Sequence, residues 1–173
     1  LFTTRCLSLC MSETGVSIDL TGASAVVTGS TRGIGAEVAK KLAAAGAVVV
    51  VSGRTEGEGN TVVNEIRSDG GAAVFCRADV RDPDDIKQLV ETADQEHGGL
   101  DILVNNAAFE TDTSPEAVDL DTWNTILETD FRAYWLAAKY AYPYLAESSR
   151  GAVVNIGSNH SSATQPKKFP YNA

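Results

Sequence analysis

Short apolar runs alternate with segments of helical spacing along most of this 173-residue chain. Ala23–Gly29 (ASAVVTG) and Ala47–Gly53 (AVVVVSG) predict buried strands, because a continuous β-branched run suits a strand covered on both faces. Three further strands are predicted at AAVFCRADV, DILVNNA and GAVVNIGS. Strands that alternate with helices form right-handed βαβ units, so the pattern predicts an α/β fold: a doubly wound parallel sheet with helices on both faces.

The segments between the strands carry helix signals of their own. Helices are predicted at 34–46 (IGAEVAKKLAAAG) and in the charged segment from Glu56 to Asp69. Asp82 and Pro83 predict the start of a third helix, as its N-cap and first helical residue. A long helix is predicted from about 120 to 146, before the fifth strand.

The predicted domain covers residues 19–173, and residues 1–18 are predicted to be a disordered N-terminal extension. The stretch before Met11 lacks the length and the cleavage pattern of a secretory signal. The last strand, AVVNI, is apolar on both alternating faces, as an interior strand is. An exposed edge of that kind promotes aggregation, so we expect further strands beside it, missing from the C-terminal end of the domain.

Composition excludes several classes of function. The net charge of −9 argues against a nucleic-acid partner, which needs a basic surface. No apolar run approaches the roughly 18 residues that span a bilayer, so no membrane segment is predicted. The three cysteines have neither a disulfide framework nor a metal-binding spacing, which predicts a cytoplasmic protein without a metal site.

A glycine-rich turn, T-G-S-T-R-G-I-G, connects the first strand to its helix. Gly29 permits a tight turn, Gly33 lets the backbone approach a pyrophosphate, and Gly35 allows close packing of helix on strand. The free N–H groups of the helix N-terminus then face the phosphates. The turn predicts a Rossmann-type dinucleotide-binding domain, with candidate cofactor-binding residues Gly29, Ser30, Thr31, Arg32, Gly33, Ile34 and Gly35.

The glycines are spaced G-x-x-x-G-x-G, which resembles the first motif of the short-chain dehydrogenase/reductase (SDR) family. Asp79, followed by Val80, matches the aspartate that contacts adenine in that family. Asn106 and Ala107 belong to an N-N-A sequence that matches the family's N-N-A-G motif, although Ala108 replaces its glycine. The resemblance covers nearly all of 19–173 and implies that these residues, too, bind a dinucleotide.

The family's catalytic pair also has counterparts. Ser158 lies thirteen residues before Tyr171, the spacing of the family's catalytic serine and tyrosine. By this resemblance Ser158 polarises the substrate oxygen and Tyr171 acts as general acid and base. The lysine of the family's Y-x-x-x-K motif falls two residues beyond Ala173. The resemblance therefore implies a chain cut inside its active-site helix, and inactive without that lysine.

One catalytic position departs from the family pattern. Asp130, in T-D-F, occupies the place of the family's catalytic asparagine. An aspartate keeps an acceptor oxygen, loses the amide donor and adds a charge. We expect Asp130 to be a third catalytic residue that supports a water relay toward the lysine.

The corner beside the second strand bears on the choice of cofactor. NAD-binding domains place an acid about 20 residues past the glycine turn, on the ribose 2′-OH. Here Gly53 holds that position, next to Arg54, and Arg32 lies inside the turn. Two arginines without a carboxylate at that corner suit a 2′-phosphate, so NADP is expected in preference to NAD.

The sequence thus predicts an oxidoreductase that transfers a hydride between NADP(H) and a carbonyl or alcohol substrate. Activities like those of 3-oxoacyl reductases and of sugar or alcohol dehydrogenases both remain open. The alternative is a non-catalytic dinucleotide-binding or sensor domain, which Asp130 and the missing lysine favour. Family relatives pair through the long helix, so its aromatic residues imply a homotetramer or homodimer; they are Trp123, Phe131, Tyr134, Trp135, Tyr140, Tyr142 and Tyr144.

Overall fold

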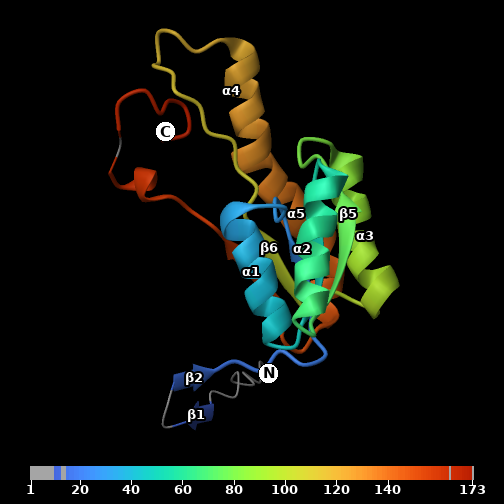
Figure 1. Ribbon diagram of the computed structural model, residues 1–173. Helices are drawn as coiled ribbons and strands as arrows, with labels where there is room; N and C mark the ends of the chain where they lie inside the picture. The colour runs from blue at the N-terminus through green and yellow to red at the C-terminus, as the bar shows by residue number, and fades with distance from the viewer. Residues whose placement is uncertain (1–9, 13–14, 164, 173) are drawn as a thin grey trace, which may run out of the picture.

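The computed structural model describes residues 10–12, 15–163 and 165–172. Its centre is a five-stranded parallel sheet, partly hidden behind α1 and α2 in Figure 1. The strand order is β5-β4-β3-β6-β7. The strands are β3 (Ser24–Val27), β4 (Val48–Gly53), β5 (Ala72–Arg77), β6 (Ile102–Asn105) and β7 (Ala152–Asn155). The chain runs outward from β3 to β5 and then crosses to β6, so the winding reverses between β3 and β6. The predicted doubly wound parallel sheet is confirmed.

Helices cover both faces of the sheet. They are α1 (Gly33–Ala44), α2 (Glu56–Ser68), α3 (Pro83–His97), α4 (Leu120–Ile126) and α5 (Ala133–Glu147). The predicted start of α3 is confirmed, because the Asp82 carboxylate accepts a hydrogen bond from the backbone N–H of Asp84 (2.9 Å).

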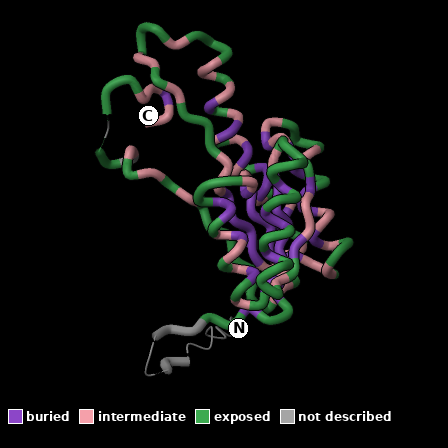
Figure 2. Tube along the Cα trace, in the orientation of Figure 1, coloured by how far each residue is buried: buried purple, intermediate pink, exposed green. Residues whose placement is uncertain are grey.

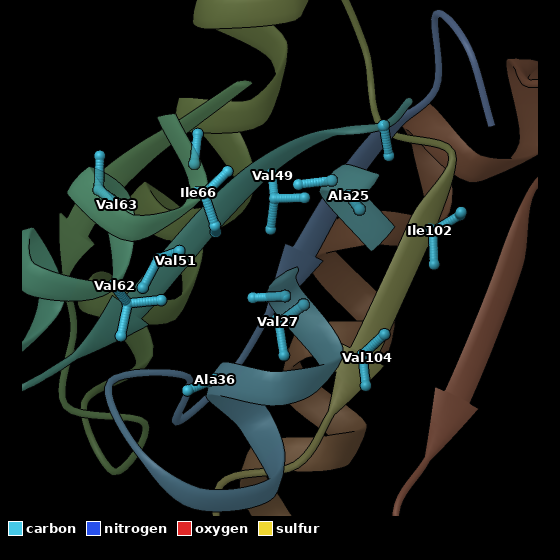
Figure 3. Close-up of a cluster of buried hydrophobic side chains, with 14 of the residues drawn as sticks. Ala25, Val27, Ala36, Val49, Val51, Val62, Val63, Ile66, Ile102 and Val104 are labelled. Carbon is cyan, nitrogen blue, oxygen red and sulfur yellow. The ribbon is translucent and has the colours of Figure 1, made fainter. Parts of the chain in front are cut away.

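Alternating strand residues divide the core into two layers. Ala25 and Val27 of β3 pack with α1 and α2, as Figure 3 shows for the labelled Ala36, Val62 and neighbouring side chains. Val26 faces the opposite way, into the layer built with α3 and α5. Burial is therefore deepest along the central strands (Figure 2).

The outer strand β7 differs from the central ones. It pairs only with β6, and Val153 and Val154 are 44% and 45% exposed. Within the described residues, β7 is therefore an exposed apolar edge of the sheet.

The predicted long helix is interrupted. Between α4 and α5 the chain forms a π-helical turn, η1 (Leu127–Arg132), in which Asp130 lies. Such a turn widens the helix by one residue and is frequent at functional sites. Helical spacing of side chains does not distinguish it from an α-helix, so the sequence predicted one continuous helix.

Two peripheral segments also differ from expectation. Within residues 1–18, predicted to be disordered, β1 (Cys10–Ser12) pairs antiparallel with β2 (Gly15–Ser17), while 1–9 and 13–14 lie outside the described residues. Around Tyr171 the chain forms turns where a helix was expected.

No helix within the described ranges combines the length and apolar character needed to cross a bilayer.

Candidate active site

A cavity of about 620 Å³ lies at the carboxyl ends of the central strands. Its wall is built by the glycine-rich turn after β3, the end of β4, residues 78–81 after β5 and residues 106–109 after β6. Thr125 and Thr129, from α4 and the π-helical turn, complete it. In an open α/β sheet, ligands bind at this place, where the direction of winding reverses.

The backbone of the glycine-rich turn leaves space on the cavity side. Gly29 has φ +63°, and a Cβ there would lie 2.8 Å from the Cα of Ala107. Gly33 has φ +58°, and a Cβ there would meet nothing within 4 Å. A Cβ on Gly35 would lie 2.4 Å from the carbonyl oxygen of Gly29, so α1 packs directly on the turn. The turn therefore combines a tight approach to β6 with an open position at the start of α1.

Asn106 fixes the turn against the end of β6. Its side-chain amide donates to the carbonyl oxygens of Thr28 and Gly29, both at 3.0 Å. In return the Thr28 hydroxyl accepts the backbone N–H groups of Asn106 (2.9 Å) and Ala107 (3.0 Å). These four bonds hold two sides of the cavity in one geometry.

Most predicted cofactor-binding residues line this cavity, and three do not. The nine in its wall are Gly29, Thr31, Arg32, Gly33, Arg54, Asp79, Val80, Asn106 and Ala107. Ser30 is fully buried and joins β3 to β4, donating to the Val27 carbonyl (2.7 Å) and accepting from the Ser52 N–H (2.9 Å). Ile34 is 65% exposed and faces a separate apolar hollow along α1, while Gly35 acts in packing.

Charged side chains gather at the β4–β5 side of the cavity. Arg81 grips Asp79 with two nitrogens, the shortest contact being 2.6 Å, and this hydrogen bonding lowers the pKa of the Asp79 carboxyl. Arg54 adds a favourable charge to the same carboxylate. Arg81 was not predicted as a site residue, although it lies only two residues after the predicted Asp79 and pairs with it locally.

The corner also contains a carboxylate that the sequence analysis excluded. Glu58, in the first turn of α2, lines the cavity and accepts a hydrogen bond from the Thr31 hydroxyl (3.2 Å). Its other oxygen lies 4.0 Å from Arg32 Nη1. The expectation of a corner without a carboxylate is therefore wrong. An acid was sought at the end of the second strand, whereas this one reaches back from the following helix.

Asp130 is half-buried in the π-helical turn. One carboxylate oxygen accepts the backbone N–H of Phe109 (2.8 Å), and the other is buried without a hydrogen-bond partner among the described residues. Burial raises the pKa of Asp130 to about 6, against the opposing effect of the Phe109 bond. This carboxyl group therefore titrates near neutral pH and holds the loop after β6.

The phenol of Tyr134 lies near Asp130. Tyr134, one turn later, donates its hydroxyl to the Ile156 carbonyl oxygen (3.4 Å). Burial, followed by the charges of Asp130 and Tyr171, raises the pKa of Tyr134 to about 12. Tyr134 was considered only as an interface aromatic, yet it acts as a neutral donor beside the strand end that leads to Ser158.

Ser158 and Tyr171 both belong to the segment after β7 and lie outside the cavity wall. The Ser158 hydroxyl accepts the backbone N–H of His160 (3.1 Å), and the edge of the His160 ring faces Tyr171 at 5.8 Å between ring centroids. Lys168, three residues before Tyr171, forms ion pairs with Asp112 (2.7 Å) and Glu110.

The C-terminal segment lies beside the loop between β6 and α4, beyond the end of the sheet (Figure 1). Phe169 packs on Trp123 of α4 at 5.5 Å between ring centroids, and Lys168 forms a bridge with Thr113. Asp130 and Tyr171 both lie close enough to Tyr134 to affect its pKa, and none of the three belongs to the cavity wall.

Comparison with known proteins identifies the family. The short chain dehydrogenase family model matches residues 23–173. Glucose 1-dehydrogenase 2 of Bacillus subtilis (strain 168) is 32% identical over 156 residues, 88% of this chain and 60% of that protein. D-beta-hydroxybutyrate dehydrogenase of Cupriavidus necator is 33% identical over 152 residues, 88% of this chain and 59% of that protein.

Solved structures agree. Gluconate 5-dehydrogenase from Burkholderia cenocepacia J2315, in complex with NADP and tartrate, superposes with a TM-score of 0.81 at 30% identity. That match covers 89% of this chain and 60% of the other. The chain thus spans about 60% of the length of these relatives. With a family model that matches from β3 onward, the chain belongs to the short-chain dehydrogenase family of oxidoreductases.

Proposed function

We propose that the protein carrying this chain is an NADP(H)-dependent reductase or dehydrogenase of small carbonyl or alcohol substrates. The observation that carries the proposal is the cavity at the β3–β6 reversal, with a glycine turn and arginines in one wall. Family membership makes oxidoreductase chemistry the starting point.

The residues of the cavity suit a dinucleotide phosphate. The N-terminus of α1 has no side-chain cap, so its first N–H groups are available to an anion. Gly33 leaves open space beside them. We infer that the turn binds the pyrophosphate where Gly29 and Gly33 line the cavity, and that Asp79 and Val80 lie along the adenine. Arg32 and Arg54 favour the 2′-phosphate of NADP, and two solved relatives hold NADP.

The bound cofactor supplies or accepts the hydride, and the chain's own residues handle the proton. We assign the proton transfer to the Tyr171 hydroxyl and the polarisation of the substrate oxygen to Ser158. Asp130 holds the loop after β6 through Phe109 and, as a carboxyl with a pKa of about 6, exchanges protons with water at neutral pH. We propose that Asp130 supports a water relay in the reaction.

The substrate class follows from the relatives only in outline. Those named here act on glucose, hydroxybutyrate and gluconate, which are hydroxy compounds of a few carbons. We propose an equally small substrate, either a sugar-like alcohol or a 3-oxoacyl compound. A cytoplasmic location fits the unpaired, buried thiol of Cys76.

We further propose a homodimer or homotetramer. An exposed apolar stripe runs along the π-helical turn and α5, formed by Leu127, Phe131, Trp135 and Tyr142. Its members are 41% to 75% exposed, and large apolar patches of this kind mark protein contacts. The long helix therefore offers a surface to a second copy.

A non-catalytic dinucleotide-binding domain is the second candidate. It is favoured by the position of Ser158 and Tyr171 outside the cavity wall. One experiment separates the two: NADPH oxidation by the complete natural protein, with a panel of ketones, aldehydes and keto acids, compared with its Tyr171→Phe variant. The reductase predicts turnover that falls at least about a hundredfold in the variant, while NADPH binding is kept. NADPH binding without turnover on any of these substrates would support the second candidate.

A further inference from the structure

Glu58 places a negative charge in the cavity wall, where the glycine-rich turn meets the end of β4. It projects from the first turn of α2, and its side chain is 44% exposed. One oxygen accepts from the Thr31 hydroxyl at 3.2 Å, and the other lies 4.0 Å from Arg32 Nη1. Both partners belong to the glycine-rich turn.

Stability does not account for this arrangement. The Arg32 side chain is 81% exposed, and ion pairs between exposed side chains contribute about 0–1 kcal/mol. The contacts of Glu58 are more important for ligand binding, because they involve donors that a phosphate could use. Thr31 and Arg32 are hydrogen-bond donors in the wall of a cavity suited to phosphates, and the Glu58 carboxylate takes the place of an anionic ligand on both.

Among the described residues, not every arginine at the β4–β5 side of the cavity forms an ion pair. Arg81 is committed to Asp79. Arg54 lines the cavity and, in the part of the chain that the structure describes, forms no ion pair within 4 Å. An incoming phosphate therefore finds Arg54 available, whereas at Thr31 and Arg32 it meets the Glu58 carboxylate.

We propose that Glu58 is a specificity-determining residue that weakens the preference of this site for NADP over NAD. A phosphate monoester carries a charge of about −1.5 to −2, so it is repelled by the carboxylate and competes with it for Arg32 and Thr31. The 2′-hydroxyl of NAD meets no such repulsion and can donate a hydrogen bond to an acid. The inference rests on the proposed function, because it concerns the ligand of the same cavity.

The test is a calorimetric titration with two ligands that need no turnover, ADP-ribose and 2′-phospho-ADP-ribose. Glu58→Gln removes the charge and keeps the shape of the side chain. We expect it to tighten binding of the 2′-phosphorylated ligand about three- to tenfold, and to leave ADP-ribose unchanged or weaker. The gain should shrink as salt is raised, because salt screens exposed charges.

Glu56→Gln is the matched control. Glu56 lies in the same first turn of α2, is exposed and is not in the cavity wall, so its loss changes the helix end equally. A second control is Arg32→Gln, alone and combined with Glu58→Gln. Competition for Arg32 predicts that the gain from Glu58→Gln becomes smaller when Arg32 is absent.

The outcomes separate this inference from the proposed function. Selective tightening in Glu58→Gln and not in Glu56→Gln supports the inference. Equal effects on both ligands, or equal effects of the two glutamate variants, overturn it and leave the proposed function standing. If the unmodified protein binds neither ligand, the proposed function fails and this inference fails with it.

Discussion

At the scale of single residues, the most informative side chain is Asp130. The fold takes a carboxylate out of water, gives one oxygen the Phe109 N–H and leaves the other without a described partner. An unpaired buried oxygen disfavours the charged form, which is why the pKa rises to about 6. The SDR pattern has an asparagine here, whose amide keeps the acceptor without a charge. Asp130 thus exchanges folding stability for a group that titrates near neutral pH.

This exchange predicts that Asp130→Asn is more stable than the unmodified protein at pH 7. Because the folded pKa is raised above the ordinary value of 3.8, the carboxyl group lowers folding stability progressively as pH rises from about 4 to 6. The half-exposed position reduces the effect, so we expect about 1 kcal/mol at pH 7 and almost none at pH 4. Urea unfolding at several pH values measures it.

Asp130→Ala serves as the control, since it removes the charge together with the acceptor for Phe109 and should gain less. A difference between Asp130→Asn and the unmodified protein that does not change with pH would contradict this account of the carboxyl group.

At the scale of elements, the π-helical turn and α5 present one buried face and one exposed apolar face. One face packs in the core through Ala133, Leu136 and Ala137, and Tyr134 reaches the Ile156 carbonyl. The opposite side exposes Phe131 and Trp135. A helix with apolar residues on both sides is covered on both sides, so the exposed stripe predicts contact with another molecule.

Trp135→Glu should therefore weaken self-association. A charge at the centre of an apolar contact leaves an uncompensated buried group, which costs several kcal/mol at an interface. Light scattering during size-exclusion chromatography of the complete natural protein should detect a shift to lower mass. Ile18→Glu is the control, because Ile18 is an equally exposed apolar residue (59%) outside the stripe, and it should leave the mass unchanged. A loss of mass in both variants, or in neither, would argue against the stripe as the interface.

Some elements could be predicted from the sequence and others could not. The five strands and the Asp82 cap depend on local patterns, so the sequence predicts them. The π-helical turn depends on backbone pairing that side-chain spacing does not encode. Glu58 joins the site only because α2 folds against the glycine turn, whereas Arg81 is a sequence neighbour of the predicted Asp79. Sequence motifs thus find residues at strand ends and miss partners supplied by neighbouring elements.

At the scale of the whole molecule, the sheet order determines where a ligand binds. The chain reverses between β3 and β6, and Asn106 ties the two strand ends together across that reversal. The cavity opens there, with the glycine turn on one side and the π-helical turn on the other. We propose that this cavity binds a nicotinamide dinucleotide.

The most direct measurement is a calorimetric titration of the protein with NADPH, with Gly33→Asp as the comparison. An added side chain at Gly33 enters open space and disturbs no packing, although φ +58° costs a non-glycine residue about 1 kcal/mol. It adds a negative charge where the phosphates are proposed to lie. The account predicts one NADPH bound per chain and at least tenfold weaker binding in a folded Gly33→Asp variant. Equal binding by the two proteins, or none by the unmodified one, would contradict it.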